Sequence, residues 1–294
     1  MYIGANSTTL ARWPTDGGSP LVADQERLAA VRGLVEDFGL SAVEVSLDSA
    51  IIFPGSVGEA FFPAVASLQK EPGFVLSMHL PFRWLDLASG NEAIRRASVD
   101  TIRRAIELAA PLRPTTYVLH PCGASTQVAA GPVNTLRRDA MTDLMRRQVS
   151  RSLGQIATLL PHRALCIETL EAPSWDMFQP AVVEHDLSIC MDAGHLLWLD
   201  VDPVEFYHQH AARIREIHLH DVRALGDGES RRYRDHLPLG AGGMDFRALL
   251  DTLKTDEFQG SVILEVFSRQ DLQQSVAALR RYLEPRDTAG RTVA

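Results

Sequence analysis

Short runs of apolar and β-branched residues recur along the chain, each followed by a turn and then by a segment with helical spacing. Buried strands that alternate with helices in this way are typical of a parallel sheet. Eight runs predict one strand each: YIGANS from Tyr2, AVEVSLD from Ala42, FVLSMHLP from Phe74, TYVLHPCG from Thr116, ALCIETLE from Ala164, SICMDAGH from Ser188, IREIHLHD from Ile214 and SVILEVF from Ser261. Eight strand–helix units in 294 residues favour an α/β fold, a single (β/α)8 TIM barrel with an outer ring of helices.

The segments between the runs predict the helices of that ring. Apolar stripes, caps and breakers place them at residues 24–38, 91–109, 136–160, 175–184, 203–212, 246–253 and 272–282. Nothing in the composition divides the chain, so we expect one barrel domain over residues 1–285 and a frayed tail over residues 286–294. The segments 11–23, 123–134 and 224–236 are long for barrel connections, and we interpret them as active-site loops.

Composition excludes several function classes. Hydrophobic residues make up 46% of the chain and the net charge is -8, which predicts a globular protein that repels nucleic-acid backbones. No run is apolar enough for a membrane span or an export signal, and three widely spaced cysteines fit a reducing cytoplasm. The only lysines are Lys70 and Lys254, both in expected helices or at their ends, so a Schiff-base mechanism has no evident nucleophile.

Polar residues concentrate at the carboxyl ends of the predicted strands, which meet at one mouth in a closed parallel barrel. Six of the ten histidines lie at these ends or in the loop after the seventh strand. The residues singled out by this pattern are His79, His120, Glu168, Asp192, His195, His218, His220, His236 and Glu265. A scatter of histidines over the surface would not produce this arrangement.

Three of these residues, Glu168, Asp192 and Glu265, lie within or beside apolar strands, where an ionised carboxylate needs a charged partner or a cation. A single histidine such as His79 is more often a hydrogen-bonding core residue, and a single strand glutamate is as often in an ion pair. The combination across six strands favours a divalent metal centre. Carboxylate and imidazole ligands suit Zn²⁺ or Mn²⁺ first, and Fe²⁺ or Co²⁺ as well, with the number of ions open.

Other signals have ordinary structural interpretations. The Gly-x-Gly in LGAGGMD follows a charged loop rather than a strand, which favours a tight turn over dinucleotide binding. His208 and His210 are expected to be exposed on a helix, where positions i and i+2 diverge. We interpret Cys122 as a small buried residue near the metal rather than a nucleophile, and Cys166 and Cys190 as strand core.

The strand-end motifs MHLPF, VLHPCG, CIETLE, MDAGH, IHLHD, HLPLGAGGMDF and ILEVF together resemble the xylose isomerase-like barrels. That superfamily includes endonuclease IV and many sugar phosphate isomerases and epimerases. In the epimerase branch, the resemblance implies one divalent ion held by Glu168, Asp192, His218 and Glu265, with the two glutamates acting on substrate protons. In the endonuclease branch, it implies three zinc ions with His79, His120, His195 and His236 as additional ligands. Arg234 stands where that branch has an aspartate.

The segments RASVDTIRRAIELAAPLRPTTYVLHP, LCIETLE, LSICMDAGHLLW, RDHLPL and LEVFSRQDLQQSVAAL are most similar to the cobamide-remodelling phosphodiesterases. This resemblance implies hydrolysis of the nucleotide loop of a corrinoid, or of a related phosphorylated small molecule. The four-ligand set would hold the principal ion, and His79, His120 and a shared Glu168 a second. His195 and His236 would complete or orient the cluster, and Glu168, Glu265, His195 and His236 are the expected catalytic residues. Arginines that follow strand ends or lie in the long loop could bind phosphate: Arg83, Arg223, Arg234 and Arg269.

Three alternatives stay open. The first is a sugar or sugar phosphate isomerase or epimerase that uses one ion and exchanges a carbon-bound proton between Glu168 and Glu265. The second is a binding module without catalysis, although mutually repulsive carboxylates without a cation would cost stability. The third is an abasic-site endonuclease, which the acidic net charge and Arg234 disfavour. We expect a phosphorylated small molecule as partner, and no nucleic acid or membrane; the sequence leaves the oligomeric state open.

Overall fold

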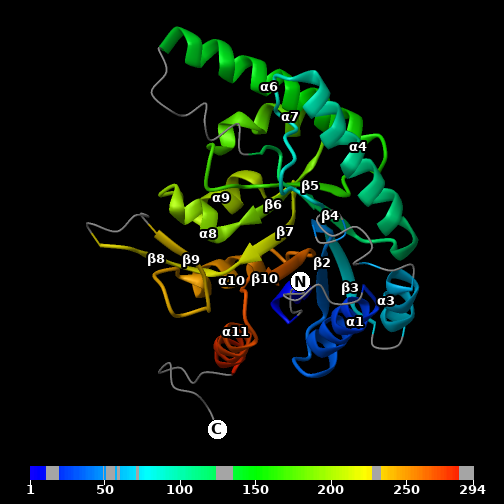
Figure 1. Ribbon diagram of the computed structural model, residues 1–294. Coiled ribbons are helices and arrows are strands. Elements are labelled where there is room, and N and C mark those ends of the chain that lie inside the picture. The colour runs from blue at the N-terminus through cyan, green and yellow to red at the C-terminus, as the bar shows by residue number, and fades with distance from the viewer. Residues whose placement is uncertain are drawn as a thin grey trace.

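The predicted barrel is confirmed by a computed structural model, which describes residues 1–10, 20–48, 50, 57, 60–70, 73–123, 135–226 and 233–284. Eight strands pair in parallel and close in the order β1-β10-β7-β6-β5-β4-β3-β2 (Figure 1). They are β1 (Tyr2–Asn6), β2 (Ala42–Ser46), β3 (Val75–His79), β4 (Thr116–Leu119), β5 (Leu165–Glu168), β6 (Ser188–Asp192), β7 (Ile214–Leu219) and β10 (Ser261–Leu264). Each of the eight predicted runs therefore contains one barrel strand.

Helices surround the strands on the outside, and long α4 and α6 lie against each other (Figure 1). The helices are α1 (Pro20–Glu36), α3 (Phe61–Lys70), α4 (Glu92–Ala109), α6 (Thr135–Ala157), α7 (Gln179–Glu184), α8 (Ala193–Trp198), α9 (Pro203–His210), α10 (Phe246–Thr255) and α11 (Arg269–Leu283). Short 3-10 turns are η1 (Ser7–Thr9), η2 (Ala110–Leu112) and η3 (Trp175–Met177). No helix in the described part of the chain is long and apolar enough to cross a membrane.

All seven predicted helices are found with shifted ends, but α8, which begins inside a predicted strand, and α3 were not predicted as helices. Helix α3 lies between β2 and β3. Its sequence, FFPAVASLQK, carries Pro63 in the first turn, where a helix does not need the missing N–H. Phe61, Val65 and Leu68 bury its inner face against the barrel. The segment 175–184 also differs from its prediction, because it divides into η3 and α7.

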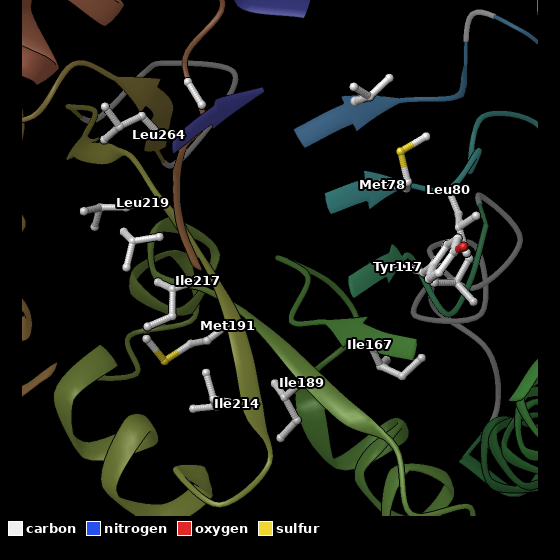
Figure 2. Packing of buried hydrophobic residues seen from close by; sticks show 14 of the residues in the cluster. Met78, Leu80, Tyr117, Ile167, Ile189, Met191, Ile214, Ile217, Leu219 and Leu264 are labelled. Atoms are coloured by element: carbon white, nitrogen blue, oxygen red, sulfur yellow. The ribbon is translucent and has the colours of Figure 1, made fainter. Parts of the chain in front are cut away.

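Side chains alternate between the two faces of the barrel wall, with one irregularity in register between β6 and β7. Residues such as Met78, Ile167, Ile217 and Leu219 belong to the main hydrophobic core, and Figure 2 shows them pointing away from the middle of the ring of strands. The intervening positions face inward, and they are largely polar. The inner apolar residues form a separate small cluster of Val118, Cys166 and Cys190. The barrel thus has an apolar outer layer and a polar interior.

The interpretation of Cys166 and Cys190 as strand core agrees with this wall. Cys166 and Cys190 are completely buried, as expected of strand core, and burial raises the pKa of both thiols well above the usual value. Cys122 is half-buried beside the hydrophobic core. These surroundings do not favour a thiolate nucleophile at Cys166 or Cys190.

The sixth predicted strand was extended too far, to His195. It ends at Asp192, whose carboxylate accepts a hydrogen bond from the backbone N–H of His195 at 2.7 Å and so caps helix α8. Aspartate is among the best N-cap residues, and its cap competes with continuation of the strand. His195 therefore lies in the first turn of α8 rather than at a strand end.

The prediction of a loop over residues 224–236 is partly wrong. Its described ends form an antiparallel hairpin, β8 (Asp221–Ala224) and β9 (Tyr233–Leu237), which stands beside the closed barrel (Figure 1). Residues 11–19 and 124–134 of the other two expected loops, and the predicted tail 286–294, lie outside the described residues.

The turn interpretation of LGAGGMD is confirmed. The buried carboxylate of Asp221 accepts hydrogen bonds from the backbone N–H groups of Gly240, Gly242 and Met244, each at 2.9 Å. Gly240 has a φ of 86°, in the left-handed region that glycine adopts without strain. Asp221 therefore fastens this turn to the start of the hairpin.

The expectation for the α9 histidines is right for only one of them. His208 is exposed, whereas His210 is half-buried, with its ring centroid 4.3 Å from that of Phe206. This burial lowers the pKa of His210. Neither histidine joins the groups of candidate ligands described below.

Candidate metal centre

The barrel mouth brings all eight predicted ligands together in three groups, two of which share Glu168. Within each group, the candidate ligand atoms lie within 4.8 Å of one another. The groups are Glu168, Asp192, His218 and Glu265; His79, His120 and Glu168; and His195, His220 and His236. Their members come from the ends of β3 to β7, from β10 and from the segments that follow these strands. The convergence of parallel strands explains why residues so distant in sequence meet here.

The four-ligand group is centred on the Nδ1 atom of His218. This atom lies 3.1 Å from Oε2 of Glu265, 3.4 Å from Oε1 of Glu168 and 3.9 Å from Oδ2 of Asp192. All four residues are buried except for a small exposed part of Glu265. Three carboxylates around one imidazole make a donor set that suits a divalent cation.

Unsatisfied atoms support this assignment. Oδ2 of Asp192, Nδ1 of His218, Nε2 of His220 and Oε2 of Glu265 are buried and have no hydrogen-bond partner. Buried polar atoms in folded proteins nearly always have such a partner, and a bound ion is one explanation for the exceptions. Three of the four atoms belong to the four-ligand group, so these residues fit a cation that they would hold directly.

A second group lies beside the first and shares Glu168. Oε2 of Glu168 is 2.9 Å from Nε2 of His120 and 3.2 Å from Nε2 of His79. The opposite nitrogen of His79 lies 3.0 Å from the carbonyl oxygen of Leu80. The ring of Phe82 stacks on His120 with centroids 4.0 Å apart. Both imidazoles are thus oriented with Nε2 toward the shared carboxylate.

The third group contains a residue that the sequence analysis did not assign as a ligand. Nε2 of His220 lies 3.1 Å from Oδ1 of Asp192, and its Nδ1 accepts the backbone N–H of His236 at 2.9 Å. The ring stacks on His236 with centroids 4.2 Å apart. The sequence signal was the repeated histidine in IHLHD, because positions i and i+2 of a strand share a face. His220 therefore brings a third imidazole to this group. The resemblance gave an aspartate, at the position of Arg234, as the further ligand here.

His195 and His236 complete this group. Nδ1 of His195 lies 3.0 Å from the carbonyl oxygen of Thr169, which turns Nε2 toward Glu171 at 3.7 Å. His236 has a φ of 51°, in a region that few residues other than glycine adopt. Its Nε2 is 3.8 Å from Oε2 of Glu265. Glu171, from the motif CIETLE, is a further carboxylate at this edge that the sequence analysis left unassigned.

Gly194 provides a test of the third group that removes no ligand. A Cβ at this position would lie 1.9 Å from Cε1 of His220. We expect Gly194→Ala to displace the imidazole and to lower the number of cations bound per chain, measured by elemental analysis after gel filtration. Gly154→Ala is the matched control, since its Cβ would meet His185 on another part of the protein at 2.7 Å. Equal metal content in Gly194→Ala and wild type would contradict a role for His220 as a ligand.

The electrostatics of the cluster show that it needs positive charge. Burial opposes ionisation of Glu168 and Glu265, but the neighbouring histidines hold the pKa of both carboxyls well below the usual range. Burial alone would lower the pKa of His79. The hydrogen bond to Glu168 and the nearby carboxylate charges outweigh this effect and raise the pKa to about 10. Imidazole protons therefore balance the carboxylates when no cation is bound, and a cation would compete with these protons for the same lone pairs.

The predicted phosphate-binding arginines are not gathered at the cluster. Arg223 and Arg234 are exposed and face each other across the β8–β9 hairpin. Arg269 lies on the outer helical layer, 3.6 Å from Asp37 and over the ring of Phe38. Arg83, which follows β3, lies 3.4 Å from Asp48. No contact between these four side chains and the predicted ligands is found in the described part of the chain.

Two further buried carboxylates, Glu44 and Glu216, lie beneath the cluster in the barrel interior. Both were visible in the sequence as glutamates within the strand runs AVEVS and IREIHL. Both glutamates interrupt a strand as Glu168 does, but neither was among the predicted ligands. Burial, followed by the charge of Glu44, raises the pKa of Glu216 to about 7.

Comparison with known proteins gives the same architecture. A family model described as a xylose isomerase-like TIM barrel matches residues 33–285. The uncharacterized protein MJ1311 of Methanocaldococcus jannaschii is 26% identical over 221 residues, which cover 70% of this chain and 69% of that protein.

Among solved structures, a D-tagatose 3-epimerase-like protein is 20% identical with a TM-score of 0.71, and the match covers 96% of this chain and 97% of that one. The D-allulose 3-epimerase from Methylomonas sp. is 15% identical with a TM-score of 0.68, covering 96% and 98% of the two chains. At these identities, the two structures establish the fold that the chains share.

Proposed function

Because this chain belongs to the xylose isomerase-like TIM barrel family, we propose that it is a divalent-metal-dependent isomerase or epimerase of a sugar or sugar phosphate. The observation that carries the proposal is the four-ligand group, with its three unsatisfied buried atoms Oδ2 of Asp192, Nδ1 of His218 and Oε2 of Glu265. The similarity in fold to a D-tagatose 3-epimerase-like protein and to a D-allulose 3-epimerase supports this class over the phosphodiesterase that the sequence favoured.

The proposed reaction needs a proton removed from carbon and returned to it. A divalent cation held by Glu168, Asp192, His218 and Glu265 would polarise a substrate carbonyl and its neighbouring hydroxyl, which acidifies the carbon-bound hydrogen between them. Glu168 and Glu265 would then act as general base and general acid. His236, 3.8 Å from Glu265, and His120, 2.9 Å from Glu168, would stabilise the ionised forms of the two carboxylates. We further propose a small-molecule substrate, in agreement with the net charge of -8.

Hydrogen exchange with solvent tests this proposal. Protein loaded with Mn²⁺ or Zn²⁺ is incubated in D₂O with a panel of ketoses, aldoses and their phosphates, and the products are examined by mass spectrometry. We expect one carbon-bound deuterium in the substrate that turns over, because the carboxylates exchange protons with water between turnovers. Protein treated with a chelator should incorporate none. Absence of incorporation from every sugar in the panel, with metal bound, would contradict the isomerase proposal.

A metal-dependent phosphodiester hydrolase is the second candidate. It is favoured by a specific observation: the histidine groups around His79 and His220 offer donors that a reaction with one cation does not require. Cations at several groups would neutralise charge on the phosphoryl oxygens and on the leaving oxygen. Two or three ions per chain, together with cleavage of a cobamide or another phosphodiester, would favour this candidate. One ion per chain with deuterium incorporation would favour the isomerase.

A further inference from the structure

A second layer of polar side chains lies directly beneath the metal ligands, in the interior of the barrel. It consists of Asn6, Glu44, Ser77, Thr116 and Glu216, contributed by five different strands. Glu44, Ser77 and Glu216 are completely inaccessible, and Asn6 and Thr116 are nearly so. Two carboxylates buried in this way are costly unless every oxygen is satisfied, so their hydrogen bonds indicate what they do.

All four carboxylate oxygens of this layer are satisfied. Oε1 of Glu44 accepts the side-chain amide of Asn6 at 2.7 Å, and its Oε2 lies 3.2 Å from Nε2 of His218. The two oxygens of Glu216 accept the hydroxyls of Ser77, at 2.6 Å, and of Thr116. This layer contrasts with the cluster above it, where acceptor atoms have no donor. Glu44 and Glu216 therefore serve as hydrogen-bond acceptors, and each of their four oxygens has a polar partner beside it.

His218 connects the two layers through its two ring nitrogens. Nδ1 faces the carboxylates of the four-ligand group, and Nε2 faces Glu44. The other ligand histidines are oriented in a comparable way, because one ring nitrogen of His79 and of His195 lies 3.0 Å from a backbone carbonyl oxygen. For His218 this place is taken by a carboxylate, which is a stronger acceptor than a carbonyl. Its counterpart Glu216 has no hydrogen bond to the imidazole among those found in the described residues.

We propose that Glu44 is a positioning residue, which accepts the Nε2–H of His218 and thereby directs the Nδ1 lone pair toward the cation and raises its basicity. A carboxylate behind a ligand imidazole fixes the tautomer and increases the affinity of the metal. Asn6 holds the other oxygen of Glu44 and so fixes the direction of the acceptor. The inference rests on the proposed function only in requiring a divalent cation at the four-ligand group.

The test is the affinity of the whole chain for Co²⁺, measured by competition with a chromophoric chelator, together with the visible spectrum of the bound ion. Glu44→Gln keeps the size of the side chain but removes the charge that the imidazole meets. We expect it to weaken Co²⁺ binding about 10- to 100-fold and to change the d–d absorption bands. Glu216→Gln is the matched control, because it makes the same substitution in the same layer, close to His218, but at a carboxylate whose oxygens accept from Ser77 and Thr116 rather than from the imidazole. It should change the dissociation constant by less than about threefold and leave the spectrum as in wild type.

Several outcomes would overturn the inference. The first is that Glu44→Gln binds Co²⁺ with the affinity and the absorption bands of wild type. The second is that Glu44→Gln and Glu216→Gln lose Co²⁺ affinity equally, which would indicate a general effect on the core. If Glu44→Gln does not fold, Glu44→Asp withdraws the carboxylate by one methylene and is compared with Glu216→Asp under the same criteria. Failure of wild type to bind Co²⁺ would contradict the metal centre itself and with it the proposed function. Normal binding by wild type and by Glu44→Gln would contradict only the role of Glu44.

Discussion

Glu168→Gln is expected to lower turnover by about a thousandfold or more, which corresponds to about 4 kcal/mol of transition-state stabilisation, and to remove bound metal. Both oxygens of Glu168 face ligand imidazoles: Oε2 lies 2.9 Å from His120 and 3.2 Å from His79, and Oε1 lies 3.4 Å from His218. Glutamine keeps the shape but carries no charge, and its amide nitrogen cannot act as a ligand or a base. The variant therefore affects the cation and the proton transfer together.

This prediction is checked on purified protein by elemental analysis, turnover and circular dichroism. Glu107→Gln, on the exposed face of α4, is the control for the loss of one negative charge, and its metal content and activity should match those of wild type. Wild-type metal content and wild-type activity in folded Glu168→Gln would show that the site is elsewhere.

Asp192 is expected to have two separable roles, as a ligand and as a helix cap. Oδ1 accepts the backbone N–H of His195 at 2.7 Å, and the unsatisfied Oδ2 lies 3.9 Å from Nδ1 of His218. Asparagine caps helices about as well as aspartate, whereas alanine does not cap them. Both Asp192→Asn and Asp192→Ala should weaken cation binding by about a hundredfold or more. In the cation-free state, Asp192→Ala should be less stable than Asp192→Asn by about 1 kcal/mol.

Urea unfolding of the chelator-treated variants measures the difference in the free energy of unfolding, and chelator competition measures cation affinity. Asp192→Asn that binds the cation as tightly as wild type would exclude Asp192 from the ligand set. Equal free energies of unfolding for the two variants would show that the hydrogen bond to His195 does not stabilise the N-terminus of α8.

The strands and the principal ligands could be predicted because their signals are local. A carboxylate such as Glu168 in an otherwise apolar run signals a charge that the core must balance, whatever the rest of the chain does. Closure of the barrel then brings Glu168, Asp192 and Glu265 to one mouth, although they are separated in sequence by tens of residues. Closure itself was predicted from the number of strand–helix units, since eight such units favour a closed barrel.

Residues defined by their partners could not be assigned in the same way. Glu44 carries the same signal as Glu168, but its role depends on Asn6 and His218, which lie 38 and 174 residues away. His220 belongs to the third group only because the fold brings His195 and His236 next to it. The start of α8 depends on one capping hydrogen bond, which outweighs the apolar run that extended the predicted strand. These features arise from tertiary contacts, which a local pattern does not contain.

The most direct test of the metal centre is anomalous diffraction at the zinc absorption edge, from crystals of the protein grown with Zn²⁺. We predict a strong peak among Glu168, Asp192, His218 and Glu265, about 2.0–2.2 Å from one oxygen of each coordinating carboxylate and from Nδ1 of His218. The occupancy at the two histidine groups then shows how many ions each chain holds. Zinc absent from the four-ligand group, or bound only at surface pairs such as His162 and Asp186, would contradict the account.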